Sequence, residues 1–164
     1  MIAKQIQSIA LKFLASHKLS PPVDIKKASE IINAELVFIE MPKSVSGLII
    51  APTPDMPAYG ISINSRHSHY HQRFTVAHEI GHLLLGHLEG SHPNITMFSD
   101  IQNFALGHHP REREANIFAA EMLIPTPHIK DIVFSAGWRD INSLCRLYGA
   151  SQQAIQIKLK EIGA

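Results

Sequence analysis

Residues 73–85 constrain the fold more than any other part of the chain. This stretch contains no proline, and apolar residues occur on every side of its helical projection, which predicts a helix that is buried in a core. Gly86 follows directly and is positioned to end that helix. The fold must therefore be built around one helix in this region of the chain.

Two histidines and a glutamate lie inside this helix in the pattern His78-Glu79-x-x-His82. Residues four apart share one face of a helix, so a single metal ion can bind both imidazoles. The pattern is typical of a zinc site in which Glu79 is the general base. Gly81 costs about 1 kcal/mol relative to alanine inside a helix, which predicts a strand or a substrate close to its backbone. The alternative is two histidines that share an apolar helix by chance.

A third ligand is expected from a second helix. A catalytic zinc ion usually has three protein ligands, and His-His-Glu is one of the known sets. Residues 109–125 predict a helix with one proline in its first turn and another at its end. We predict Glu112 as the third ligand, and Asn116, one turn later, as the acceptor of the second ring N–H of a ligand histidine. Glu114 stays an alternative ligand, and both glutamates could instead favour the positive end of the helix dipole.

These residues predict a hydrolytic mechanism. Zinc held by His78, His82 and Glu112 would bind a water molecule and lower its pKa towards about 7. Glu79 would accept a proton from that water and pass it to a leaving amine. A further donor would stabilise the developing oxyanion. The sequence leaves five candidates for that donor: Tyr70, His71, His108, His109 and Tyr148.

The other histidines near the motif are better explained without a metal. His87 follows the glycine that ends the helix, so we expect it to be a surface or capping residue and not a ligand. His67, His69 and His71 alternate as they would on an extended segment. A solvated loop or strand face is therefore favoured over a second metal site.

Two longer stretches resemble a known family. Residues 72–85 read QRFTVAHEIGHLLL, and residues 112–125 read EREANIFAAEMLIP. Together they resemble the ImmA/IrrE family of zinc metallo-endopeptidases, and the likeness extends over most of the chain. The histidines at 67, 69 and 71 depart from the family pattern. The resemblance implies a thermolysin-like ligand plan and protein substrates, often repressors or antitoxins of stress systems and mobile elements.

Composition agrees with a single domain that spans residues 1–164. A chain of 164 residues with 45% hydrophobic content can form one core. The net charge of +1 gives no reason to expect nucleic acid or an anionic membrane as the main partner. The single cysteine, Cys145, suits a reducing cytoplasm, and no stretch is long enough to span a bilayer.

The remaining pattern predicts an α+β fold. We expect a small three-stranded mixed or antiparallel sheet, with strands near residues 36–40, 48–51 and 58–64, packed on a zincin-like helical core. Asp24 is expected to cap a helix that precedes the sheet. An edge of the sheet beside the zinc helix could pair with an extended substrate peptide. Residues 91–107 are expected to form a mobile loop over the site.

The helical C-terminal tail allows an alternative interpretation, namely a DNA-binding motif. Residues 141–161 have the helix, glycine turn and helix of a DNA-reading motif, but the second helix offers only Lys158 and Lys160 against Glu161. A packed helical pair is therefore favoured, and direct binding of nucleic acid is not expected.

Two functions stay open. The first is a cytoplasmic zinc-dependent endopeptidase that cuts a regulatory protein, such as a helix-turn-helix repressor or an antitoxin. The second is a catalytically silent zinc-containing binding or sensor protein that contacts a transcriptional regulator. Glu79 favours the first, because a structural zinc site has no use for a carboxylate that does not bind the metal.

Overall fold

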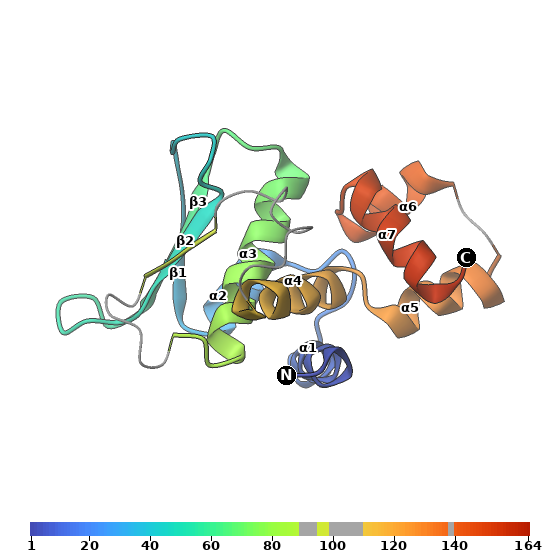
Figure 1. Ribbon diagram of the computed structural model, residues 1–164, viewed down its shortest axis with the longest axis horizontal. Helices are drawn as coiled ribbons and strands as arrows, with labels where there is room; N and C mark the ends of the chain where they lie inside the picture. Colours follow the sequence, from blue (N-terminus) through green and yellow to red (C-terminus); the bar gives the residue numbers. More distant parts are fainter. Residues whose placement is uncertain (89–94, 99–109, 138–139) are drawn as a thin grey trace.

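A sheet and a group of C-terminal helices lie on opposite sides of two central helices (Figure 1). The computed structural model describes residues 1–88, 95–98, 110–137 and 140–164 of the chain, with the backbone alone for 95–98. The combination of a small sheet with helices before, between and after its strands confirms the predicted α+β class.

Among the described residues, the sheet contains four strands in the order β1-β3-β2-β4. Their bounds are β1 (Ala34–Ile39), β2 (Gly47–Ile50), β3 (Tyr59–Asn64) and β4 (Ile95–Phe98). β1 runs parallel to β3, whereas β2 is antiparallel to both β3 and β4, so the sheet is mixed. The three predicted strands are present within two residues of their predicted bounds. β4 was not predicted, because a strand of four residues is defined by the pairing that β2 offers rather than by its own sequence pattern.

One face of the sheet packs against α3 (His69–Leu84), the helix that carries the histidine motif. Ile49, Ile61 and Ile63 are fully buried, and Ile49 lies directly opposite Ile61 in the antiparallel pair. At Gly47, a Cβ atom would lie only 2.6 Å from the Thr75 methyl group of α3. The strand and the helix therefore approach closely because residue 47 has no side chain.

The helix α3 begins at His69, one turn earlier than predicted. The Ser68 hydroxyl accepts a hydrogen bond from the His71 backbone N–H at 3.3 Å and so caps the helix. Gly86, with a φ of 73°, follows its end as predicted. The prediction of an extended segment for His67, His69 and His71 is wrong, since the last two lie in the first turn of α3 and only His67 precedes it.

The helix α4 (Pro110–Leu123) packs directly against α3. A Cβ atom at Gly81 would lie 3.1 Å from Phe118 Cδ1 and 3.3 Å from the Ala115 carbonyl oxygen. A close neighbour of Gly81 was predicted, but that neighbour is α4 and not a strand or a substrate. The glycine thus sets the distance between the two helices that carry the candidate site residues.

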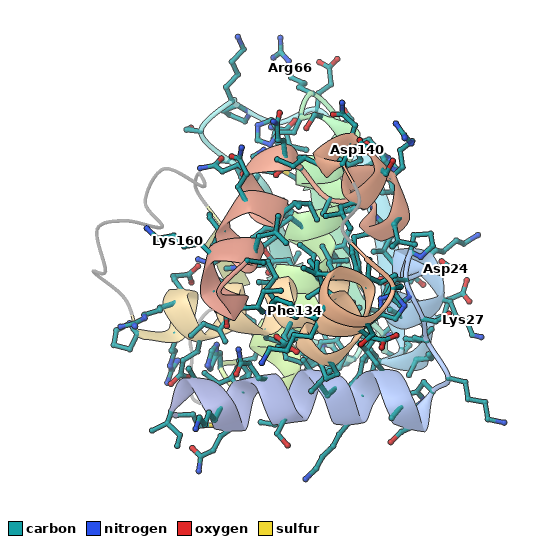
Figure 2. The ribbon with its side chains drawn as sticks, turned by 90° about the vertical axis from the view of Figure 1, so that its right-hand side faces the viewer. Asp24, Lys27, Arg66, Phe134, Asp140 and Lys160 are labelled. Carbon is teal, nitrogen blue, oxygen red and sulfur yellow. The ribbon has the colours of Figure 1, made fainter. Side chains whose placement is uncertain are left out.

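Two helices from the N-terminal part support this core. α1 (Ala3–Ser16) lies across one end of the molecule and contacts α4 (Figure 2). α2 (Ile25–Ile31) precedes β1. Asp24 caps α2 as predicted, since its Oδ1 accepts a hydrogen bond from the Lys27 backbone N–H at 3.0 Å.

The C-terminal tail consists of α5 (Thr126–Lys130), a π-helical turn (Asp131–Ser135), α6 (Ile141–Tyr148) and α7 (Gln152–Ile162). Lys158 is buried, and its Nζ lies 2.6 Å from Glu121 Oε2 of α4, so it does not belong to a basic surface. Lys160 is exposed on the outer side of α7 (Figure 2). The tail is therefore a helical pair packed on the core, as predicted.

Two other predictions concern the membrane and the loop after α3. None of the helices that the structure describes has the length and apolar character needed to cross a bilayer. Within the predicted loop at 91–107, residues 95–98 form β4, and the rest lie outside the described residues.

Candidate metal centre

The two histidines of the motif lie one turn apart on α3, in the interior of the protein. His78 and His82 are both buried, and their Nε2 atoms lie 2.9 Å apart. The i, i+4 spacing on one helix face produces this convergence. Both rings therefore present a nitrogen to the same small volume.

Glu112, in the first turn of α4, completes the cluster. Its Oε2 lies 3.1 Å from His78 Nε2, and its Oε1 lies 3.3 Å from His82 Nε2. One ligand atom from each of the three residues lies within 4.8 Å of the others. The Glu112 side chain is one-third exposed, so the cluster is accessible to solvent on that side.

Glu114, the alternative ligand, lies elsewhere. Its Oε2 is 3.0 Å from Nε2 of His87. Residues two apart on a helix point in different directions, so only one of the two glutamates can face α3 at the histidine pair. The structure brings Glu112, and not Glu114, to His78 and His82.

The electrostatics of the cluster suit a cation. Burial lowers the pKa of His82, which favours the neutral imidazole. Burial by itself would raise the pKa of Glu112, but its hydrogen bonds with His78 and His82 outweigh that effect and bring the pKa well below its usual value. Neutral imidazole and ionised carboxylate are the protonation states that bind a metal ion.

Glu79 is fully buried beside the cluster. Neither of its carboxyl oxygens has a hydrogen-bond partner among the described residues. Burial raises its pKa well above the usual value, and the negative charge of Glu112 raises it further. A buried carboxyl group without partners is costly and requires an explanation. A metal ion with a water molecule next to this group would supply the missing partner, so the residues present fit such an ion.

Asn116, one turn after Glu112 on α4, contacts the first histidine. Its Oδ1 lies 2.9 Å from His78 Nδ1. An amide oxygen accepts, so His78 donates from Nδ1–H; in a neutral ring this leaves the Nε2 lone pair for a metal, which would replace the Nε2 contact with Glu112. This is the contact that the sequence predicted for Asn116.

His87 makes the equivalent contact with the second histidine. Its Nδ1 lies 3.0 Å from His82 Nδ1, and its Nε2 lies 3.0 Å from Glu114 Oε2. The carboxylate accepts from His87 Nε2–H, so His87 Nδ1 can accept from His82 Nδ1–H and leave His82 Nε2 for a metal.

The prediction of a surface or capping position for His87 is wrong, because only 5% of it is exposed. Gly86 turns the chain back through its positive φ, and the His87 backbone N–H then donates to the His82 carbonyl at 2.9 Å. A histidine immediately after the glycine that ends the helix was the signal that could have revealed this contact.

The five residues that were candidates for stabilising the oxyanion lie in different parts of the structure. The Tyr148 hydroxyl is buried and lies 2.8 Å from His128 Nδ1, and burial raises its pKa to about 12. Tyr148 is thus part of the tail packing. Tyr70 and His71 lie in the first turn of α3, whereas His108 and His109 lie outside the described residues.

Comparison with known protein families gives a match. A family model described as Peptidase_M78, IrrE N-terminal-like domain, matches residues 32–160. The matched region contains the whole sheet, α3, α4 and every residue of the cluster. No curated protein matches the chain significantly.

Proposed function

The chain belongs to the Peptidase_M78 family with an IrrE N-terminal-like domain, and from this premise we propose that it is a zinc-dependent endopeptidase. Membership of this family supports the assignment of a metallopeptidase activity with protein substrates. The observation that carries the proposal is the Glu79 carboxyl group, which is buried without a partner beside a His-His-Glu cluster. A purely structural metal site would not retain such a group, because its burial is costly.

Three residues would hold the metal: His78, His82 and Glu112. Zinc in such a site lowers the pKa of a bound water towards about 7 and polarises a carbonyl group. Asn116 and His87 would keep both imidazoles in the tautomer that exposes Nε2. Three protein ligands would leave room for a water molecule on the metal, and the one-third exposure of the Glu112 side chain would let solvent reach the site.

Glu79 would move the proton. Its carboxylate accepts a proton from the water whose oxygen attacks the scissile carbonyl carbon. The same carboxyl group then donates that proton to the amide nitrogen as the C–N bond breaks. Burial raises the pKa of Glu79 well above its usual value, which suits a group that must both accept and release a proton.

The substrate would bind as an extended peptide along the β4 edge of the sheet. In the described part of the chain, β4 is an edge strand, and α3 contacts β2, β3 and β4. Main-chain pairing at such an edge would hold a peptide beside the cluster without requiring a particular sequence. The resemblance to the family suggests a cytoplasmic regulatory protein of the repressor or antitoxin type, in stress response or mobile-element regulation.

Metal analysis combined with a cleavage assay tests the proposal. Wild type and Glu79→Gln are purified, their zinc content is measured by elemental analysis, and each is incubated with candidate repressors and with an unfolded protein. We expect one zinc ion per chain in both proteins and cleavage by wild type alone. Glu30→Gln, an exposed glutamate on α2, is the matched control and should behave as wild type.

The other outcomes separate the alternatives. Zinc in both proteins with no cleavage by either would favour a catalytically silent binding or sensor protein. Full activity of Glu79→Gln would refute the mechanism. Absence of zinc from both proteins would refute the metal site.

A further inference from the structure

A cavity of about 370 Å³ lies between α3, α4 and α7. Apolar side chains from all three helices line it: Phe74 of α3, Leu123 of α4 with the following Ile124, and Ala154 and Ile157 of α7. This volume lies in the range of sites that bind small molecules or large side chains. We refer to this cavity as the apolar pocket.

The charged side chains that line the apolar pocket are already paired. Lys158 Nζ lies 2.6 Å from Glu121 Oε2 and 3.4 Å from Glu161 Oε2. His71, another lining residue, has its Nε2 2.9 Å from the Ser46 hydroxyl oxygen. A charged guest would lose hydration here without gaining an equivalent partner, so the pocket favours a neutral and apolar guest.

On each central helix, a residue that lines the apolar pocket lies one turn from a residue at the metal cluster. Phe74 precedes His78 by four residues on α3, and Ala120 follows Asn116 by four residues on α4. Residues four apart lie on the same helix face, about 6 Å apart along the axis. An extended peptide advances roughly 3.3 Å per residue, so a peptide held at the cluster can place a nearby side chain in the pocket.

We propose that the apolar pocket binds one large apolar side chain of the polypeptide substrate, such as leucine, methionine or phenylalanine, close to the bond that is cut. The inference rests on the proposed peptidase function and deepens it, since it names a determinant of specificity. The C-terminal tail then has a function beyond packing, because α7 provides one wall of the pocket.

A cleavage profile tests this inference. Zinc-loaded full-length protein is incubated with a mixture of synthetic decapeptides that vary at every position, and the products are identified by mass spectrometry. We expect large apolar residues to be favoured at least tenfold at one fixed distance from the cut. Ala154→Trp, which fills the pocket, should lower kcat/KM for those peptides at least tenfold, mainly through KM, and shift the preference to alanine and glycine.

Two further variants make this result interpretable. Gln156→Trp introduces the same side chain at an exposed position of α7 that does not line the pocket, and it should keep the wild-type profile. Ala154→Leu is the milder change to use if the tryptophan variant does not fold. A wild-type profile without any apolar preference, or a folded Ala154→Trp protein with an unchanged preference, would overturn the inference.

A binding measurement separates the pocket from the peptidase activity. Zinc-loaded Glu79→Gln is titrated with N-acetyl-leucinamide and, separately, with N-acetyl-aspartamide, while methyl resonances are followed by NMR. We expect the first probe to shift the methyl signals of Leu123, Ala154 and Ile157, and the second to leave them unchanged. Binding without cleavage by wild type would refute the peptidase and keep the pocket, whereas absence of these shifts would refute the pocket.

Discussion

Nδ1 of His82 lies 3.0 Å from Nδ1 of His87, and this contact leaves His82 Nε2 facing His78 and Glu112. His87 is held in turn by Glu114 at 3.0 Å. Each histidine of the cluster thus has its own outer partner, since Asn116 contacts Nδ1 of His78. Such partners orient ligand imidazoles and raise their affinity for metal.

Removal of His87 should weaken metal binding. In His87→Ala, the His82 ring loses the partner that fixes its tautomer, so we expect the affinity for zinc to fall about 10–100-fold. Competition with a chelator of known affinity measures the change. His17→Ala removes an exposed histidine and is the control. Equal affinities in His87→Ala and wild type would mean that the contact does not support the site.

The two glutamates of α4 should differ sharply in their effect on metal binding. Glu112→Ala removes an oxygen donor from the cluster and should lose the metal during purification. Glu114→Ala should retain the metal with an affinity within about tenfold of wild type, because Glu114 contacts His87 and not the cluster itself. Zinc content by elemental analysis distinguishes the two. If Glu114→Ala loses the metal and Glu112→Ala retains it, then Glu114 is the ligand and the assignment of Glu112 is wrong.

Glu79→Gln should make the metal-free protein more stable above pH 5. Burial, and next the charge of Glu112, raise the pKa of Glu79 in the folded chain well above its usual value of 4.5. The folded state therefore holds a proton that the unfolded state releases, so wild type loses stability as pH rises from the unfolded pKa towards the folded pKa. Glutamine does not titrate and avoids this loss.

Thermal unfolding of the metal-free proteins between pH 4 and 8 measures this difference. We expect the Tm of wild type to fall below that of Glu79→Gln as the pH rises, by about 2–4 °C for each kcal/mol of lost stability. The other titrating groups are the same in both proteins, so their contributions to the pH dependence of Tm cancel in the comparison. Tm curves that stay parallel over the whole range would contradict the prediction.

Gly81→Ala should destabilise the packing of α3 on α4. The added Cβ would lie 3.1 Å from Phe118 Cδ1 and 3.3 Å from the Ala115 carbonyl oxygen. Overpacking of a core costs about 1–3 kcal/mol, against a gain of about 1 kcal/mol in helix propensity. We expect a lower Tm, and a smaller loss when the change is made in a Phe118→Leu background. An unchanged Tm would show that α4 can move away freely.

Several features of the site could be predicted because they depend on residues close in sequence. The spacing of His78 and His82 places both imidazoles on one helix face wherever that helix lies. The same periodicity relates Glu112 to Asn116 on α4. Asp24 caps α2 through a backbone N–H three residues away. Each of these inferences required only the geometry of a single helix.

Other features were not predicted because they depend on neighbours that are distant in sequence. The four residues of β4 form a strand by pairing with β2. Gly81 is close to Phe118, a residue of another helix, and not to a strand or a substrate. The apolar pocket exists only because α7 folds back onto α3 and α4.

The sequence by itself determined which side chains share a helix face, and so it paired His78 with His82 on one helix and Glu112 with Asn116 on another. Only the tertiary structure decided that Glu112 and not Glu114 meets the histidines, that His87 contacts His82, and that a pocket forms between α3, α4 and α7. The physical reason is that helical periodicity is encoded locally by side-chain spacing. The relative rotation and approach of two helices, in contrast, result from the packing of the whole core.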